Sequence, residues 1–222
     1  CRYLVPVSME WKRLTRAEAE AITAAGMQVV SVFQRGNNDA AGGAANGTRD
    51  GKAALQEAKQ IGQPIGTAIY FAVDYDAQPK DYAAIDAYLR AAAKELPGYT
   101  VGVYGSYAVV EEMAKRGACK HFWQTYAWSR GKVSKAANLY QYKNGQELAG
   151  HTVDYNDALG GEGWWNTHPQ KEDKPVIIPT WKRQDHDELL VAGVLTENHS
   201  TTLDEPVPKW MLFTMINRIR KL

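Results

Sequence analysis

The most informative stretch of the chain is an apolar run that ends in two carboxylates, T-A-I-Y-F-A-V-D-Y-D, from Thr67 to Asp76. Its aromatic and β-branched residues are typical of a strand buried on both faces. Side chains two apart on a strand share a face, with α-carbons roughly 7 Å apart. We therefore expect Asp74 and Asp76 to leave the carboxyl end of this strand side by side. The alternative is a pair of polar turn residues, because Asp is common where strands end.

Strand-like and helix-like segments alternate along the first three quarters of the chain. Thr15 and Glu18 have the spacing of a capping box that opens a helix, and Gly26 closes it. Pro79 opens a long amphipathic helix that Pro97 stops. The remaining helices are expected over 50–60 and 106–116, and the strands over 2–7, 27–34, 67–76, 99–104, 121–128, 138–142 and 151–155.

This alternation predicts an α/β fold with βαβ units and a parallel sheet. Seven strands in a chain that opens on a strand fit a (β/α)8 TIM barrel whose first strand is missing from this chain. A doubly wound open sheet is the second choice, and no glycine-rich dinucleotide fingerprint follows any strand. The glycine- and asparagine-rich stretch 35–47 lies where a strand hands over to a helix, which is typical of a binding loop or of a surface insertion.

Composition and charge narrow the classes of function. With 222 residues and a formal net charge of +1, the chain has no electrostatic reason to bind nucleic acid. No apolar stretch is long enough for a membrane span. The start carries no signal peptide, which suggests that the natural N-terminus is missing, so export cannot be judged from it. Two cysteines and five scattered histidines predict neither a disulfide framework nor a metal site, and no cofactor is expected.

Five strand-end motifs carry a resemblance to a known family. They are Y-F-A-V-D-Y-D, V-G-V-Y-G-S-Y, F-W-Q-T-Y-A-W, L-Y-Q-Y and H-T-V-D-Y-N-D-A, and they fall in order. Together they resemble the glycoside-hydrolase-like TIM barrels of wall-lytic and secreted proteins of Gram-positive bacteria and their phages. That family is similar to the family 25 lysozymes, which cut the glycan of peptidoglycan.

The resemblance implies a site for an N-acetylated glycan on the rim formed by the carboxyl ends of the strands. Family 25 lysozymes carry Asp-x-Glu on the fourth strand, where Glu is the general acid; here the matching residues are Asp74 and Asp76, and the shorter Asp puts hydrolysis in doubt. Another acidic residue of the family lies on the first strand, which is absent here. Further matches on the later strands are Asp154 and Asn156, Gln141 and Tyr142, Trp123, Gln124 and Tyr126, and Tyr104.

The chemistry can also be argued from the residues. Glycoside cleavage needs one protonated carboxyl as acid, and a second carboxylate that activates water, attacks the sugar or orients a reacting acetamido group. Asp76 is the candidate acid and Asp74 the group that stays ionised or shares the proton. Asp154 would steady positive charge on the sugar or hold a neighbour in place. Tyr104, Trp123 and Tyr126 would stack on sugars or simply pack the barrel, and Gln141 and Asn156 would bind substrate or make structural hydrogen bonds.

The C-terminal part differs in character. Residues 1–165 are expected to form the barrel, and 166–222 a linker with two helices, over 185–194 and 208–221. This tail loosely resembles one repeat of the helical modules that follow wall hydrolases, and a helix pair packed on the barrel is the alternative.

Three functions remain open. The first is a monomeric glycosidase, extracellular or associated with the cell wall, that acts on peptidoglycan or a related glycan. The second is a glycan-binding protein on a hydrolase scaffold, since fold alone does not separate the two. The third, a metal-dependent deacetylase or phosphodiesterase, lacks well-placed ligands other than His151.

Overall fold

The protein was analysed as a computed structural model that describes residues 1–168, 188, 189, 191 and 192. Residues 1–168 form one compact unit, and the remainder of the chain forms a second. Both predicted C-terminal helices therefore lie outside the described residues, apart from the four positions named. Among the described residues, the longest helix has 19 residues, and no helix has both the length and the hydropathy that a bilayer crossing needs.

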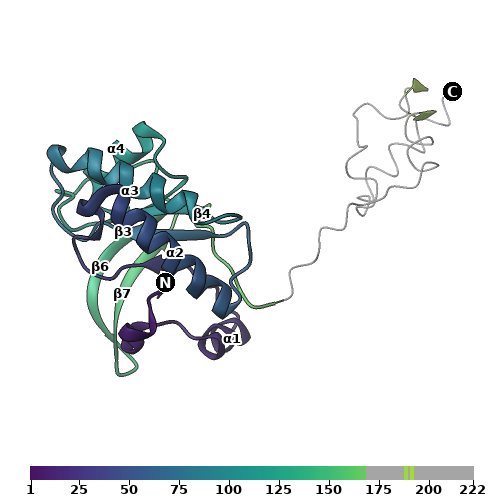
Figure 1. The fold of residues 1–222 in the computed structure, drawn as a ribbon. Coiled ribbons are helices and arrows are strands. Elements are labelled where there is room, and N and C mark those ends of the chain that lie inside the picture. The colour runs from purple at the N-terminus through teal and green to yellow at the C-terminus, as the bar shows by residue number, and fades with distance from the viewer. Residues whose placement is uncertain (169–187, 190, 193–222) are drawn as a thin grey trace. The chain divides into compact units, whose positions relative to one another are not determined.

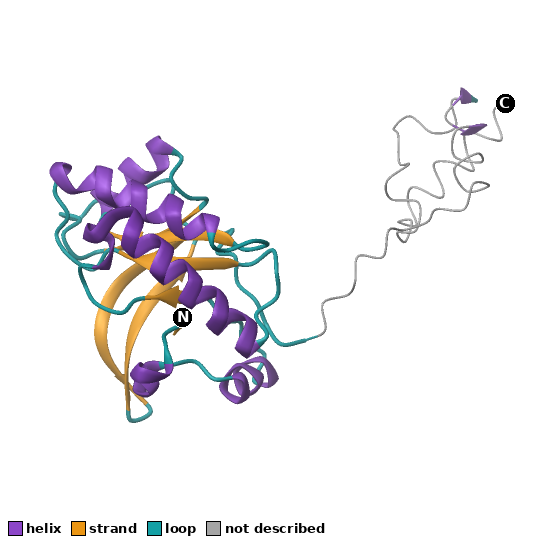
Figure 2. Ribbon diagram, viewed as in Figure 1, coloured by secondary structure: helices purple, strands orange, loops and turns teal. Residues whose placement is uncertain are grey.

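The first unit is built on one seven-stranded sheet in the order of the sequence (Figures 1 and 2). Neighbouring strands from β1 to β6 pair in parallel, and β7 returns antiparallel to β6. The strands are β1 (Arg2–Tyr3), β2 (Ser31–Phe33), β3 (Ala68–Ala72), β4 (Thr100–Gly105), β5 (His121–Thr125), β6 (Leu139–Leu148) and β7 (His151–Ala158).

The prediction of an α/β fold with seven strands is confirmed, but a complete TIM barrel is not formed. The sheet curls, and within residues 1–168 its outer strands β1 and β7 do not pair with each other. The predicted all-parallel sheet is wrong at its last pair. Only two residues, Ala149 and Gly150, join β6 to β7, and so short a connection can make only an antiparallel hairpin.

Helices connect most of the parallel strands and lie on one face of the sheet (Figure 2). The side chain of Thr15 accepts a hydrogen bond from the Glu18 N–H, as the capping prediction requires, whereas the Glu18 carboxylate binds Arg2 instead of completing the box. The helices are η1 (Val7–Lys12), α1 (Arg16–Ala24), η2 (Asp39–Gly42), α2 (Gly43–Ile61), η3 (Pro79–Asp81), α3 (Tyr82–Lys94) and α4 (Tyr107–Arg116).

The glycine-rich stretch is mostly helix, so the prediction of a long loop over 35–47 is wrong. Gly47 and Gly51 lie on the side of α2 that packs against α3. A β-carbon at Gly47 would lie 2.2 Å from the carbonyl oxygen of Tyr88, and one at Gly51 would lie 2.8 Å from that of Ala92. These glycines therefore allow two helix backbones to approach closely, and a short turn at 34–38 remains between β2 and η2.

Two apolar clusters, one on each face of the sheet, form the core. The larger lies between the sheet and the helices, and includes Phe33, Phe71 and Tyr88. The smaller lies on the other face, and consists of Val30, Val32, Ala68, Tyr70, Ala72, Trp123 and Leu139, with Tyr3 and Tyr104 packed against it. The alternation of side chains along each strand thus separates a face covered by helices from a face without them. Polar groups lie on this second face, at the carboxyl ends of the parallel strands.

Candidate functional site

Polar side chains meet at the carboxyl ends of the parallel strands, on the face that the helices leave uncovered. On β3, Ala68, Tyr70 and Ala72 belong to the smaller apolar cluster, and Asp74 follows two residues later. We refer to the group as the carboxyl-end cluster. Its members are Tyr3, Gln34, Asp74, Tyr104, Thr125, Gln141 and Asp154, one from each of the seven strands or from the one or two residues after it.

Gln141 on β6 connects three of the strands in this cluster. Its Oε1 accepts hydrogen bonds from the hydroxyls of Tyr104 (2.8 Å) and Thr125 (2.7 Å). Its Nε2 donates to Oδ2 of Asp154 at 2.8 Å. Because both ends of the amide are engaged, its orientation is fixed, and it holds Asp154 in register with β4 and β5.

The carboxylate of Asp154 is held on both sides. Besides Gln141, the backbone N–H of Gly145 donates to its Oδ1 at 2.9 Å. Asp154 lies in the first half of β7. Because β7 runs antiparallel to β6, this half of the strand lies at the carboxyl end of the sheet. Two donors on two different oxygens fix the orientation of this carboxylate.

Asp74 approaches the same place from β3. Its Oδ2 accepts a hydrogen bond of 2.9 Å from Nε2 of Gln34, and the described residues offer no donor to its Oδ1. Burial raises the pKa of Tyr3 and of Tyr104, and the charges of Asp74 and Asp154 raise both further. Geometry links both carboxylates to Tyr104, because Gln141 joins its hydroxyl to Asp154 and the N–H of Val73, next to Asp74, donates to its carbonyl oxygen at 2.8 Å. With their raised pKa values, both phenols stay neutral at neutral pH.

The predicted pairing of Asp74 with Asp76 on one strand face is wrong. β3 ends at Ala72, and the chain bends at Tyr75, whose carbonyl oxygen accepts a hydrogen bond from the Ala77 N–H. The side chain of Asp76 is exposed, and within the described chain no donor contacts its carboxylate. The last residue pair between β3 and β4 is Ala72 with Tyr104, whereas the apolar run continues to Val73. The apolar pattern therefore predicted a longer strand than the structure has.

Trp123 on β5 and Asn156 on β7 are joined by a side-chain hydrogen bond next to the cluster. Nε1 of Trp123 donates to Oδ1 of Asn156 at 2.8 Å, and Nδ2 of Asn156 donates to the Asp154 carbonyl oxygen at 3.1 Å. Trp123 is 6% exposed, and its ring packs at a steep angle against Tyr70 and Tyr104. A ring so buried packs the sheet and has no open face on which a sugar could stack.

The side chains of three other predicted residues contact groups outside the cluster. Gln124 is fully buried and bonds the backbone of Lys132 and Ser134, so it fixes the connection between β5 and β6. Tyr126 and Tyr142 are about two-fifths exposed. The first donates to Asn144, and the second, adjacent to Gln141 and so on the opposite face of β6, packs against Tyr155.

Three members of the carboxyl-end cluster, Tyr3, Gln34 and Thr125, were not predicted from the sequence, and neither was Lys12 next to them. Gln34 ends an apolar run just as Asp74 does, so the same signal was present there. Tyr3 and Thr125 are indicated by alternation only when the strand register is known. Lys12 comes from η1, and its Nζ donates to the Gln34 carbonyl oxygen at 2.9 Å and lies 4.5 Å from the Tyr3 ring centre. Burial lowers the pKa of Lys12, and the charges of Asp39 and Asp74 oppose that shift.

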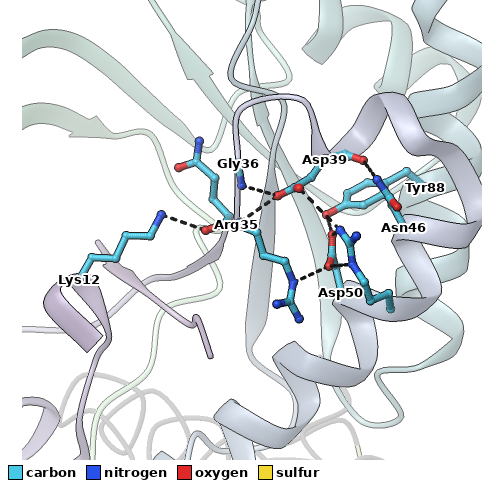
Figure 3. Close-up of polar contacts among 9 residues, drawn as sticks. Lys12, Arg35, Gly36, Asp39, Asn46, Asp50 and Tyr88 are labelled. Carbon is cyan, nitrogen blue, oxygen red and sulfur yellow. Dashed lines mark hydrogen bonds and ion pairs between the residues drawn. The ribbon is translucent and has the colours of Figure 1, made fainter. Parts of the chain in front are cut away.

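The turn that carries Gln34 is anchored by a buried carboxylate (Figure 3). Asp50 on α2 is fully buried and accepts hydrogen bonds from Arg35, Arg49 and the Tyr88 hydroxyl. Asp39 accepts the backbone N–H groups of Arg35 and Gly36 at 2.8 and 2.9 Å. This network fixes the turn after β2, and therefore the position of Gln34 next to Asp74. Within the described residues, no group of three His, Cys, Asp or Glu side chains is arranged to hold a metal ion.

Comparison with known proteins gives the family. Residues 1–158 match the Rv2525c-like, glycoside hydrolase-like domain. The chain belongs to this family. The predicted resemblance to glycoside-hydrolase-like proteins is thereby confirmed, whereas the relation to family 25 lysozymes and to Gram-positive and phage wall-lytic proteins stays a prediction.

Solved structures and curated relatives agree with that assignment. The Tat-secreted protein Rv2525c of Mycobacterium tuberculosis, solved in complex with L-tartrate, shares 25% identity with a TM-score of 0.68, over 74% of this chain and 86% of that one. An uncharacterized B. stearothermophilus protein shares the fold, with 21% identity and a TM-score of 0.56 over the same shares of the two chains.

Two uncharacterized proteins of Bacillus subtilis (strain 168) are similar in sequence. YbfG is 32% identical over 117 residues, and FadG is 32% identical over 130. The matches cover 47% and 52% of this chain but 16% and 22% of those proteins. This chain thus corresponds to one part of those much longer relatives.

Proposed function

We propose that this glycoside-hydrolase-like protein is a glycosidase that cleaves the amino-sugar glycan of peptidoglycan or a related polymer, with Asp74 and Asp154 as its paired carboxylates. One observation carries the proposal: two carboxylates from strands far apart in the sequence are both linked to Tyr104 at the carboxyl end of the sheet, Asp154 through Gln141, and Asp74 as the neighbour of Val73, whose N–H donates to the Tyr104 carbonyl oxygen. That edge is where α/β enzymes place their chemistry.

The hydrogen bonds divide the work between the two carboxylates. Both oxygens of Asp154 accept donors, so its carboxylate is held in place, and its role is to steady the oxocarbenium-like transition state. Asp74 has one oxygen that no described residue engages, and this oxygen exchanges a proton with the glycosidic oxygen or with water. Tyr104, kept neutral, donates its hydroxyl hydrogen to Gln141 and so helps to hold Asp154 in place.

An extracellular or wall-associated location fits this activity. The Mycobacterium tuberculosis relative is a Tat-secreted protein, and a secreted protein meets the wall polymer directly. The groups invoked here all come from one chain, so a monomer suffices for the reaction.

A second function, glycan binding without cleavage, is favoured by one specific observation. Asp76 stands where family 25 lysozymes carry the acid Glu, and its side chain is exposed. A scaffold that lost its acid would still bind sugar through the carboxyl-end cluster.

Purified protein incubated with labelled cell walls separates the two functions. We expect new reducing ends from the wild type, and a loss of at least about 100-fold in Asp74→Asn, the order of magnitude of general acid–base catalysis. Asp76→Asn and the exposed strand residue Asp157→Asn should retain the activity. Saturable binding without reducing ends would contradict the enzyme and support the binding protein; loss of activity in Asp76→Asn alone would move the acid to Asp76.

A further inference from the structure

Lys12 reaches the carboxyl-end cluster from η1, outside the strands. Its Nζ donates to the Gln34 carbonyl oxygen at 2.9 Å, and Gln34 in turn holds Asp74 through its side chain. The ammonium group also lies over the Tyr3 ring, 4.5 Å from the ring centre. Figure 3 shows Lys12 extended toward the turn after β2, on the side opposite the Arg35–Asp50 pair.

The ammonium group of Lys12 is left without an anionic partner in the described chain. The charges of Asp39 and Asp74 raise the pKa of Lys12, yet no carboxylate oxygen of the described residues lies within 4.0 Å of its Nζ. Asp39 is engaged by two backbone N–H groups and lies 3.6 Å from Arg49, while Asp74 is bound by Gln34. An ammonium has three donors, and one of the three is used here.

An aromatic ring lies beside this charge. Trp11 is 83% exposed, and the Lys12 Nζ is 5.6 Å from the centre of its ring. An open indole face is suited to stacking on a sugar, whose axial C–H groups are apolar. Buried Trp123 cannot offer such a face, whereas exposed Trp11 provides an aromatic surface beside Lys12.

We propose that Lys12, with Trp11 beside it, forms a subsite for a sugar that carries an oxyanion, either a carboxylate or a phosphate ester. This inference rests on the proposed function and specifies its substrate. Two donors of Lys12 would bind the oxyanion while the indole covers the ring. The positive charge offsets the repulsion that Asp74 and Asp154 would otherwise exert on an anionic glycan.

Binding of matched oligosaccharides tests the subsite. The probes are peptide-free hexasaccharides of alternating N-acetylglucosamine and N-acetylmuramic acid, with free lactyl carboxylates, with these carboxylates amidated, or amidated and carrying a phosphate ester. Each is titrated by calorimetry against the wild type, Lys12→Met, Lys12→Arg and Lys120→Met. Lys120 is exposed and lies just before β5, at the opposite end of the sheet, so it controls for loss of a surface charge.

We expect the wild type to bind the carboxylate form about tenfold more tightly than the amide, the scale of one charge-assisted hydrogen bond. Lys12→Met should bind both forms as weakly as the wild type binds the amide, whereas Lys12→Arg and Lys120→Met keep the preference. A preference for the phosphate form that disappears in Lys12→Met supports the subsite and identifies phosphate as its oxyanion.

Equal binding of all three forms by the wild type would overturn the subsite, as would an equal loss for all forms in Lys12→Met. In both cases binding or cleavage of glycan persists, so the proposed function survives. If the wild type neither binds nor cleaves any of the three, the proposed function fails and the subsite fails with it.

Discussion

Carboxylates in this protein differ in how many of their acceptor sites are already occupied. Asp50 is fully buried, and two guanidinium groups and the Tyr88 hydroxyl use its oxygens, so its role is to hold the turn after β2. Asp74 receives one donor, from Gln34, and keeps an oxygen available. Residual acceptor capacity therefore separates Asp74, which we propose to exchange a proton, from Asp50, whose role is structural.

Alternation predicted part of the site at this scale. The family resemblance supplied Tyr104 and Gln141, and Gln141 is the third residue of the ten-residue β6 rather than a strand end. Alternation itself placed Asp74 at the end of a strand. It could not show that the strand stops before Asp76, because a local apolar pattern does not record where the ladder partner ends. It also could not reveal Lys12, whose place depends on how η1 folds back over β2.

At the scale of elements, the contact between α2 and α3 explains why a glycine-rich stretch is helical. Local propensity disfavours glycine in a helix by about 1 kcal/mol relative to alanine, which is why the sequence predicts a loop there. The close approach of Gly47 to Tyr88 and of Gly51 to Ala92 outweighs that cost through packing. This contact was invisible in the sequence because it depends on a partner helix roughly 40 residues away.

Replacing Gly47 by Ala tests this packing. The new methyl group would lie 2.2 Å from the Tyr88 carbonyl oxygen, so the helices must separate. We expect the free energy of unfolding to fall by about 1–3 kcal/mol, the usual cost of overpacking, despite the better helix propensity of Ala. Urea unfolding measures the change, and Lys52→Ala, on the exposed side of α2, should stay within about 0.5 kcal/mol. A stabilised Gly47→Ala protein would show that the two helices are not in close contact.

At the scale of the whole unit, the segment after β7 completes the fold at the amino end of the sheet. The Gly163 carbonyl oxygen accepts a hydrogen bond from the Ala68 N–H, and Trp165 pairs with Val29 through both backbone groups. Trp165 is fully buried, and its indole N–H donates to the Ser31 hydroxyl at 2.9 Å. The seven strands and their order could be predicted from the strand and helix repeat. The sequence left 164–174 open between a linker and a barrel-closing segment, and the pairing with Val29 could not be predicted because this segment has no strand-like period.

Two adjacent tryptophans provide a matched test of this closure. Trp165→Ala removes a fully buried ring, so we expect the free energy of unfolding to fall by about 3–5 kcal/mol. Trp164 is 43% exposed, and Trp164→Ala should cost less than about 1 kcal/mol. Thermal unfolding of the full chain, followed by circular dichroism, compares the two. Equal effects would show that the segment after β7 does not belong to the folded unit.

The central claim is that Asp74 and Asp154 act as one catalytic unit, and a double-mutant cycle tests it most directly. The rate of reducing-end release from purified glycan strands is measured for the wild type, Asp74→Asn, Asp154→Asn and the double variant. Because residues that act together are strongly non-additive, we expect each single substitution to lower the rate by about 100-fold or more and the double variant to be no slower than the slower single. The claim would be contradicted if the rate loss of the double variant equalled the product of the two single losses, or if either single variant kept full activity.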